Sequence, residues 1–137
     1  MQTMQQRRAA FALEQVQKAK GKVKDDEFKS QASSLPAMIH MNGLGQAAAF
    51  FCSKGNEKPP KGYDENTHQA LFDILSGWLR EPGQPFHGHA GLLEGITGSD
   101  MEAYLLAQAE AQALMDWVKK FAKALMADEN GQGEGAP

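Results

Sequence analysis

The chain has 137 residues, of which 42% are apolar and 23% are charged, and its formal net charge at pH 7 is −3. This length and composition fit one globular domain and exclude a disordered protein. Cys52 is the only cysteine, which excludes an internal disulfide and fits a reducing, cytoplasmic setting.

Charge is distributed unevenly along the chain. Residues 1–62 contain ten Lys and Arg against five Asp and Glu, whereas residues 63–137 contain four against twelve. Such a division favours a molecule with one basic and one acidic face, which would suit docking on a polyanion or on copies of itself. A simpler interpretation, in which these charges only solvate the surface, stays open at this point.

The start of the chain predicts two helices. Thr3 followed by Gln6 is a capping-box pattern, so a helix should begin near Met4 and fade over residues 21–24. A second, shorter helix fits residues 26–34, with acidic residues in its first turn. The inward-facing positions of the first helix are three and four residues apart, as a helix requires: Ala9, Ala12, Val16, Ala19 and Val23.

Pro36 suits the first turn of a helix but not its interior, so a third helix should begin at Ser34 or Leu35 and end at Gly55. Residues 35–51 contain no charge, and the predicted helix carries apolar side chains on nearly all of its faces. We therefore expect the other helices to pack around it. The stretch is too short and too rich in polar residues and glycine to span a membrane, so we predict no membrane contact.

Two pairs of residues interrupt this apolar helix. Gly43 and Gly45 would each weaken a helix by about 1 kcal/mol relative to alanine, which predicts that a neighbouring helix approaches closely there. Asn42 and Gln46 are four residues apart and would share a narrow polar line, either in the core or at an interface with another molecule.

The second half of the chain predicts three more helices. Asn66 or Asp64 should cap a helix that runs to Arg80, and a short helix fits residues 90–94 within a connection rich in Gly and Pro. The last helix should begin at a capping box, Ser99 and Glu102. Its inward-facing positions are Tyr104, Ala107, Ala111, Leu114, Val118, Phe121 and Leu125.

These elements predict an all-α fold. We expect a compact single-domain bundle of about five to six helices around a central apolar helix, over residues 1–128. Residues 129–137 contain nothing to bury and should form a mobile tail.

Signals for catalysis or for a bound metal are weak. His87 and His89 could hold a metal only with further ligands such as His68, because zinc needs three or four protein ligands. Cys52 follows an apolar helix and is typical of a small buried hydrophobe. We predict no catalytic residue, no cofactor and no metal; a small metal-dependent enzyme using these histidines is the third hypothesis, behind two binding functions described below.

The basic residues carry more information. Helical geometry places Arg7, Lys18 and Lys22 within about 60° of one another on the first helix, with Arg8 beside them. Phe11 should project into this basic side, where its ring could stack on a base or fill a pocket. On the last helix, three lysines lie almost opposite the apolar stripe: Lys119, Lys120 and Lys123. Each group could also be an ordinary solvated helix face.

Three stretches in this order, RRAAFALEQV, LPAMIHMNGLGQAAAFF and YLLAQAEAQALMDWVKKFAKAL, resemble the small helical subunit of the type III-B (Cmr module) CRISPR effector complex. The resemblance implies an all-α protein that is not a nuclease. It also implies that several copies stack as a minor filament beside the guide-RNA-bearing backbone subunits and the large subunit. There they would help to hold the guide RNA–target RNA duplex in antiviral defence.

By motif position, seven residues match the pattern of that family: Arg8, Asn42, Gln46, Glu110, Trp117, Lys119 and Lys120. We interpret Trp117 as a core residue. The predicted RNA- or partner-binding set is Arg7, Arg8, Phe11, Lys18, Lys22, Asn42, Gln46, Lys119, Lys120 and Lys123. An alternative function is a structural protein–protein assembly adaptor without direct RNA contact.

Overall fold

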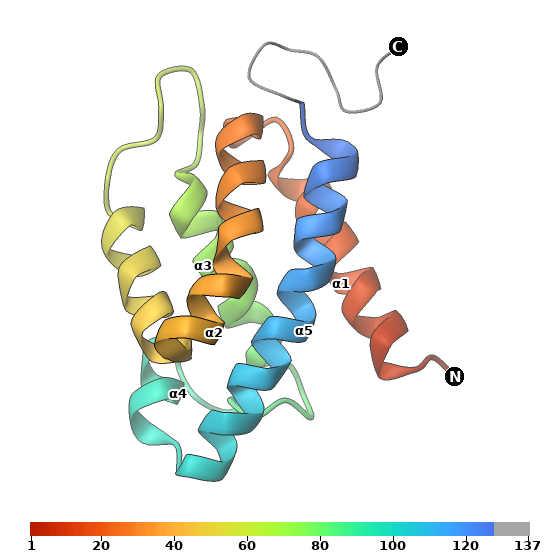
Figure 1. Cartoon of the computed structure of the whole chain (residues 1–137), viewed down its shortest axis with the longest axis vertical. Helices are drawn as coiled ribbons and strands as arrows, with labels where there is room; N and C mark the ends of the chain where they lie inside the picture. Colours follow the sequence, from red (N-terminus) through yellow and green to blue (C-terminus); the bar gives the residue numbers. More distant parts are fainter. Residues whose placement is uncertain (128–137) are drawn as a thin grey trace.

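Five α-helices make up the secondary structure of residues 1–127, the part of the chain that the structure, a computed structural model, describes (Figure 1). They are α1 (Met4–Ala19), α2 (Asp25–Gly55), α3 (Thr67–Leu79), α4 (Leu92–Gly98) and α5 (Met101–Leu125). No strand occurs in this range, which confirms the all-α prediction. The predicted tail over 129–137 lies outside the described residues.

The first helix begins as predicted and ends early. The Gln6 N–H donates to the Thr3 hydroxyl oxygen at 3.1 Å, and the Thr3 N–H donates to the Gln6 side-chain oxygen at 2.8 Å, so the capping box is formed. The helix ends at Ala19, because the chain turns at Gly21 with a φ of 90°. Lys22 therefore does not lie on α1, and the prediction that placed it there is wrong.

Residues 26–34 and 35–55, predicted as two helices, form one element whose break lies at Gly43 and not at Pro36. The missing N–H of Pro36 costs the helix one hydrogen bond. Burial of Leu35 and Ile39 on either side of it keeps the helix continuous. At Gly43, with φ 87° and ψ 158°, the chain turns sharply and α2 becomes two arms, residues 25–42 and 44–55 (Figure 1).

The helix α2 is central to the bundle, as predicted. It packs against α3, α4 and α5, whereas α1 packs mainly against α5. Each arm contributes fully buried side chains to one core: Phe28, Ala32, Leu35 and Ile39 from the first, and Leu44, Ala47, Ala48 and Phe51 from the second. The prediction that α2 is surrounded on all sides is wrong, since Met41 is 80% exposed and Phe50 is 43% exposed.

The starts of the remaining helices lie within one or two residues of the prediction, but α4 ends at Gly98 and not near residue 94. Asn66 caps α3 by accepting a hydrogen bond from the Gln69 N–H at 3.1 Å. Asp100, and not Ser99, caps α5, because its carboxylate accepts the Ala103 N–H at 2.8 Å. The Ser99 hydroxyl is buried without a partner in the described part of the chain. None of the five helices combines the length and apolar character that crossing a membrane requires.

Candidate RNA and partner interface

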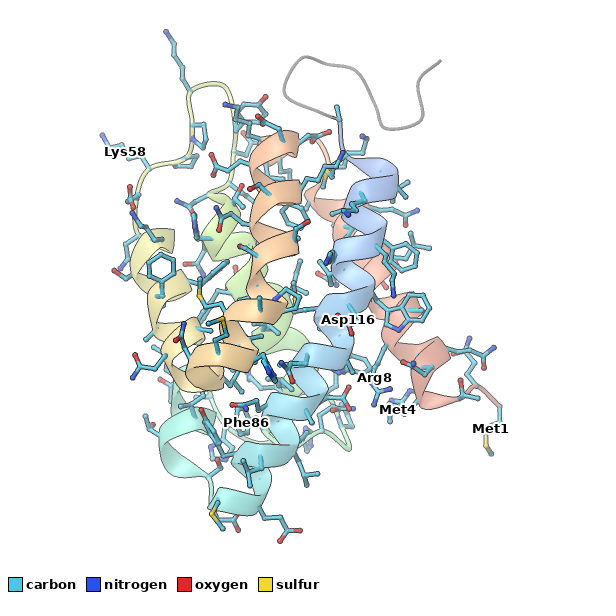
Figure 2. The ribbon with its side chains drawn as sticks, viewed as in Figure 1. Met1, Met4, Arg8, Lys58, Phe86 and Asp116 are labelled. Carbon is cyan, nitrogen blue, oxygen red and sulfur yellow. The ribbon has the colours of Figure 1, made fainter. Side chains whose placement is uncertain are left out.

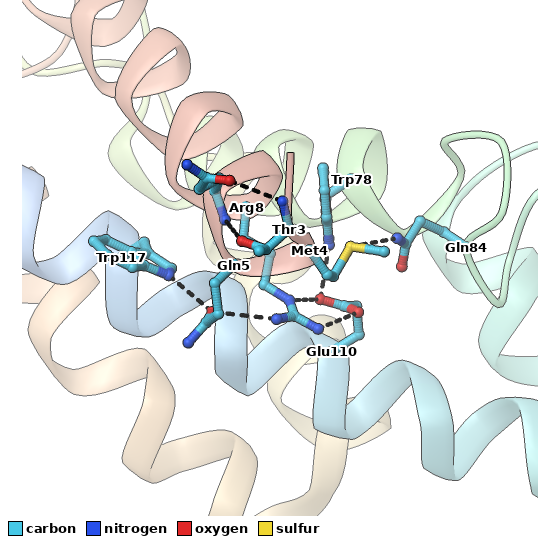
Figure 3. Close-up of polar contacts among 9 residues, drawn as sticks. Thr3, Met4, Gln5, Arg8, Trp78, Gln84, Glu110 and Trp117 are labelled. Carbon is cyan, nitrogen blue, oxygen red and sulfur yellow. Dashed lines mark hydrogen bonds and ion pairs between the residues drawn. The ribbon is translucent and has the colours of Figure 1, made fainter. Parts of the chain in front are cut away.

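Arg8 lies between α1 and α5 (Figure 2), where it forms a two-pronged ion pair with Glu110. Its Nη2 donates to Glu110 Oε1 at 3.0 Å, and its Nε donates to Glu110 Oε2. Trp78 Nε1 of α3 donates to the same Oε2 at 3.1 Å, and Arg8 Nη1 donates to Gln5 (Figure 3). The Arg8 and Glu110 side chains are only 19% and 12% exposed. Glu110 thus links α5 to α1 and α3, and Arg8 does not stand on an open basic surface.

The electrostatics of Glu110 follow from this contact. Burial acts to raise the pKa of the Glu110 carboxyl, but the hydrogen bonds from Arg8 and Trp78, together with the charge of Arg8, hold that pKa below its ordinary value of 4.5. Glu110 correspondingly raises the pKa of Arg8. Both groups are therefore charged in the neutral range and stabilise the packing of α1 on α5.

Phe11 also points into the molecule. Its ring lies 5.1 Å from the ring of Trp78 and packs against the hydrophobic core. The prediction that it projects into a basic side is wrong, because α3 covers that side of α1. Helical angles alone give the direction of a side chain but do not indicate which neighbouring helix meets it.

The other cations of the amino-terminal segment do not form a uniform basic stripe. Lys18 pairs with Glu14 at 2.9 Å, and both side chains are more than half exposed. Lys18 and Lys22 line a shallow groove of about 190 Å³ between α1 and α3 that Glu65 and Asp73 also line. The positive charges are thus partly balanced within the molecule. Of the cations predicted here to bind RNA or a partner, Arg7 is exposed and lies outside this groove.

The lysines of α5 differ from those of α1. Lys120 and Lys123 are exposed and Lys119 is half-buried, and within residues 1–127 none of the three forms an ion pair. Lys120 Nζ lies 5.9 Å from the centre of the Trp117 ring. Trp117 stacks on Phe121 at 5.7 Å and donates a hydrogen bond to Gln5 at 3.2 Å (Figure 3). Trp117 is half-buried, so it lies at the edge of the core and supports the lysine face.

Asn42 and Gln46 are exposed, so the structure places them on the surface and not in the core. Together with three apolar residues they line a groove of about 650 Å³ between the two arms of α2: Met38, Met41 and Phe50. Neither carboxamide has a hydrogen-bond partner among the described residues.

The predicted close approach at the glycines of α2 is confirmed. A Cβ at Gly45 would lie 3.3 Å from the Tyr104 hydroxyl and 3.4 Å from a methyl group of Ile96. Tyr104 accepts a hydrogen bond from the Gly45 N–H at 2.9 Å, and Gln108 accepts one from the Leu44 N–H at 2.8 Å. These α5 side chains cap the second arm of α2. This role is not visible in the sequence, because the capping residues lie about 60 positions away along the chain.

The histidines of the metal hypothesis are not brought together. His68 lies against the ring of Phe51 at 4.9 Å, and burial lowers its pKa. His87 contacts the main-chain oxygen of Arg80, and His89 lies against Phe86. No group of three or more His, Cys, Asp or Glu within residues 1–127 is arranged to hold a metal ion.

The family profile described as CRISPR-associated protein (Cas_Cmr5) matches residues 4–125, a range that begins with α1 and ends with α5. The chain belongs to the Cmr5 family. It is 30% identical over 126 residues to the CRISPR system Cmr subunit Cmr5 of Thermus thermophilus, and this match covers 92% of the chain and 98% of the relative.

A solved structure agrees with this assignment. The crystal structure of a CRISPR-associated Cmr5 family protein from Thermus thermophilus superposes with a TM-score of 0.70 at 28% identity, covering 91% of this chain and 99% of the other. The resemblance found in the sequence is therefore confirmed: the chain is a small helical subunit of the Cmr module, the type III-B system.

Proposed function

We propose that this Cmr5 family chain is a non-catalytic subunit that stacks in several copies and helps to hold the guide–target RNA duplex during antiviral defence, with the lysine face of α5 directed at RNA. The lysine face consists of Lys119, Lys120 and Lys123. The observation that carries the proposal is that these three cations make no ion pair within residues 1–127. Lysines without internal ion pairs can neutralise phosphates without breaking an ion pair of the fold.

The cations of the amino-terminal segment would contribute less to RNA binding than the lysine face. Arg7 is exposed and can reach a phosphate or a neighbouring subunit. Lys18 and Lys22 stand beside acidic side chains, which reduces the local positive potential. Arg8 and Phe11 support the packing of α1, so their contribution to binding would be indirect.

Stacking would allow each copy to bind RNA only weakly. A filament that grows head to tail needs two unlike surfaces on each subunit, and the division of charge along this chain is compatible with such surfaces. Each copy then needs only a few phosphate contacts, because several copies on one RNA raise the overall affinity. Weak binding by the isolated chain is consistent with this role.

The test is charge reversal of the lysine face in the assembled effector complex. Lys119→Glu, Lys120→Glu and Lys123→Glu together should weaken capture of target RNA at least tenfold at moderate salt. They should also flatten the salt dependence, since each lost phosphate contact lowers the slope by about 1. Complexes that carry this variant at normal stoichiometry and capture RNA normally across salt concentrations would refute an RNA-facing lysine face.

The matched control is the same number of charge reversals elsewhere: Lys54→Glu, Lys58→Glu and Lys61→Glu. These lysines are exposed at the end of α2 and in the following loop, and Lys58 projects away from the helices (Figure 2). This control variant should capture RNA normally. A similar loss of capture in both variants would point to net charge and not to the lysine face.

The second candidate function, an assembly adaptor without RNA contact, is favoured by the uncharged groove between the arms of α2. Crosslinking the assembled complex to labelled target RNA separates the two functions. An absence of crosslinks from every copy would favour the adaptor, and crosslinks that map to the lysine face would favour RNA holding.

A further inference from the structure

Trp117 lies beside the lysine face, and three contacts determine how its indole ring is oriented. The Trp117 Nε1 donates a hydrogen bond to the side-chain oxygen of Gln5 at 3.2 Å. The ring of Phe121, four residues further along α5, stacks on it at a centre-to-centre distance of 5.7 Å and an interplanar angle of 25°. Lys120 Nζ lies 5.9 Å from the centre of the Trp117 ring. A ring that is held at its edge and stacked on a neighbour gives the ammonium group a fixed support.

Gln5 is itself held in place. Its side-chain oxygen accepts a second hydrogen bond, from Arg8 Nη1 at 3.2 Å, and Arg8 is fixed by its ion pair with Glu110 (Figure 3). Gln5 belongs to the first turn of α1, which begins at the capping box. A chain of polar contacts therefore reaches from the ion pair through Gln5 to the Trp117 ring, on which Lys120 lies.

The three lysines of the lysine face are not equivalent. Lys120 lies over an aromatic ring, whereas neither Lys119 nor Lys123 makes a ring contact or an ion pair with any of residues 1–127. An exposed lysine samples many rotamers, and it loses this freedom when it binds a phosphate. Lys120 has lost part of it beforehand, and its ammonium group still has N–H donors for a phosphate oxygen.

We propose that Trp117, held by Gln5, is a positioning residue that orients the Lys120 ammonium group toward an RNA phosphate. Trp117 acts through Lys120 and does not contact RNA itself. The inference rests on the proposed RNA-facing lysine face and deepens it, because it assigns the best-defined phosphate contact of the three lysines to Lys120. It also gives Gln5 and Arg8 an indirect part in RNA binding.

The test is a double-mutant cycle on the capture of target RNA by reconstituted complexes that contain the chain at normal stoichiometry. Trp117→Leu removes the ring but keeps an apolar side chain, and it should weaken capture about threefold, the size of a lost exposed cation–π contact. Lys120→Ala should weaken capture further than this, because a phosphate contact is lost. In the Lys120→Ala background, Trp117→Leu should have no additional effect, since Lys120 is its only connection to RNA.

Two kinds of result would overturn the proposal. An equal loss from Trp117→Leu with and without Lys120 would mean that the ring contacts RNA directly or supports the fold as a whole. Normal capture by either single variant would mean that Trp117 does not position a phosphate-binding lysine.

Two milder substitutions keep the test informative if Trp117→Leu fails to fold, which thermal unfolding of the isolated chain would show. Trp117→Phe keeps a ring under Lys120 and should capture RNA better than Trp117→Leu. Gln5→Ala frees the edge of the Trp117 ring at an exposed position and should weaken capture less than Trp117→Leu does. Gln17→Ala, at another exposed position of α1, is the control and should capture RNA normally. Equal capture by the Gln5 and Gln17 variants, or equal losses from the two Trp117 variants, would contradict the proposal.

The two proposals fail separately. If charge reversal of all three lysines leaves RNA capture normal, RNA holding by the lysine face is refuted, and the positioning role falls with it. If that reversal weakens capture but the effects of the Trp117 and Lys120 substitutions simply add, the lysine face stands and only the positioning role is refuted.

Discussion

The two halves of α5 use their polar residues in opposite ways. In the first half, Tyr104, Gln108 and Glu110 are all engaged within the molecule, the first two with the second arm of α2 and the third with Arg8. In the second half, the lysine face has no ion pair among residues 1–127. The comparison separates polar residues that build the fold from polar residues that remain available to a partner.

This difference depends on what each half packs against. The first half lies where the turn of α2 and the start of α1 leave N–H groups and a cation that need partners. The lysines face away from the buried stripe of the same helix, so solvent satisfies them. We therefore expect substitutions in the first half to change stability, and substitutions in the second half to change binding.

The largest effect on stability is expected for Arg8→Ala. Removing one partner leaves the half-buried carboxylate of Glu110 without its cation, which should cost about 3 kcal/mol, the lower end for a broken buried pair. Urea unfolding of the isolated chain measures it. The neighbouring exposed Arg7→Ala should change stability by less than about 0.5 kcal/mol. Equal effects of the two substitutions would show that Arg8 is not a structural residue.

A second effect is expected at the turn that the first half of α5 caps. Gly43→Ala should destabilise the chain by about 2 kcal/mol, because alanine disfavours a φ of 87° with a ψ of 158°. Steric clash is not the cause, since a Cβ there would lie 3.4 Å from the Tyr104 hydroxyl. As a control, Gly77→Ala within α3 should stabilise the chain by up to about 1 kcal/mol. Thermal unfolding that ranks the two substitutions the other way would contradict the described turn.

Acidification should remove the stabilisation that the Arg8–Glu110 ion pair gives to the fold. Because the folded pKa of Glu110 is lower than its unfolded value, the ion pair contributes stability above pH 4.5 and loses it as the pH falls through the folded pKa. The free energy of unfolding of Glu110→Gln should therefore fall less steeply below pH 4.5 than that of the unmodified chain. Parallel curves, measured by urea unfolding across this range, would mean that Glu110 does not carry the linkage.

The smallest effect on stability is expected in the second half of α5. Reversing all three charges of the lysine face should change the stability of the isolated chain by no more than about 0.5 kcal/mol per site, since exposed charges without partners contribute little. Circular dichroism and thermal unfolding measure this. A loss comparable to that of Arg8→Ala would contradict the division between the two halves.

Much of the fold could be predicted because its causes are local. The capping box at Thr3, the cap at Asn66 and the buried stripe of α5 all depend on residues within a few positions of one another. The predicted helix boundary at Pro36 is wrong, because the hydrogen bond lost there costs less than the buried residues around it contribute. The cap of α5 moved from Ser99 to Asp100, since both residues can serve and only the register of packing selects between them.

The candidate site could be predicted less completely. The lysine face was predicted from three cations opposite an apolar stripe, and the structure leaves Lys120 and Lys123 exposed and Lys119 half-buried. Arg8 and Phe11 were placed on a surface because the angle of a side chain around α1 does not indicate that α3 and α5 cover it. Tyr104 was predicted only as a buried stripe position, and Gln108 was not predicted to have a role. Both cap the second arm of α2 and so help to determine the shape of the groove.

The sequence by itself determined that this chain is helical, where its capped helices begin, and that its pattern is that of the Cmr module small subunit. Only the tertiary structure decided which charges are internal and which are free, and that α2 turns at Gly43 to open a groove. The physical reason is separation along the sequence, because capping and periodicity involve residues only a few positions apart. The Arg8–Glu110 pair, in contrast, joins positions 102 residues apart and forms only when the helices pack.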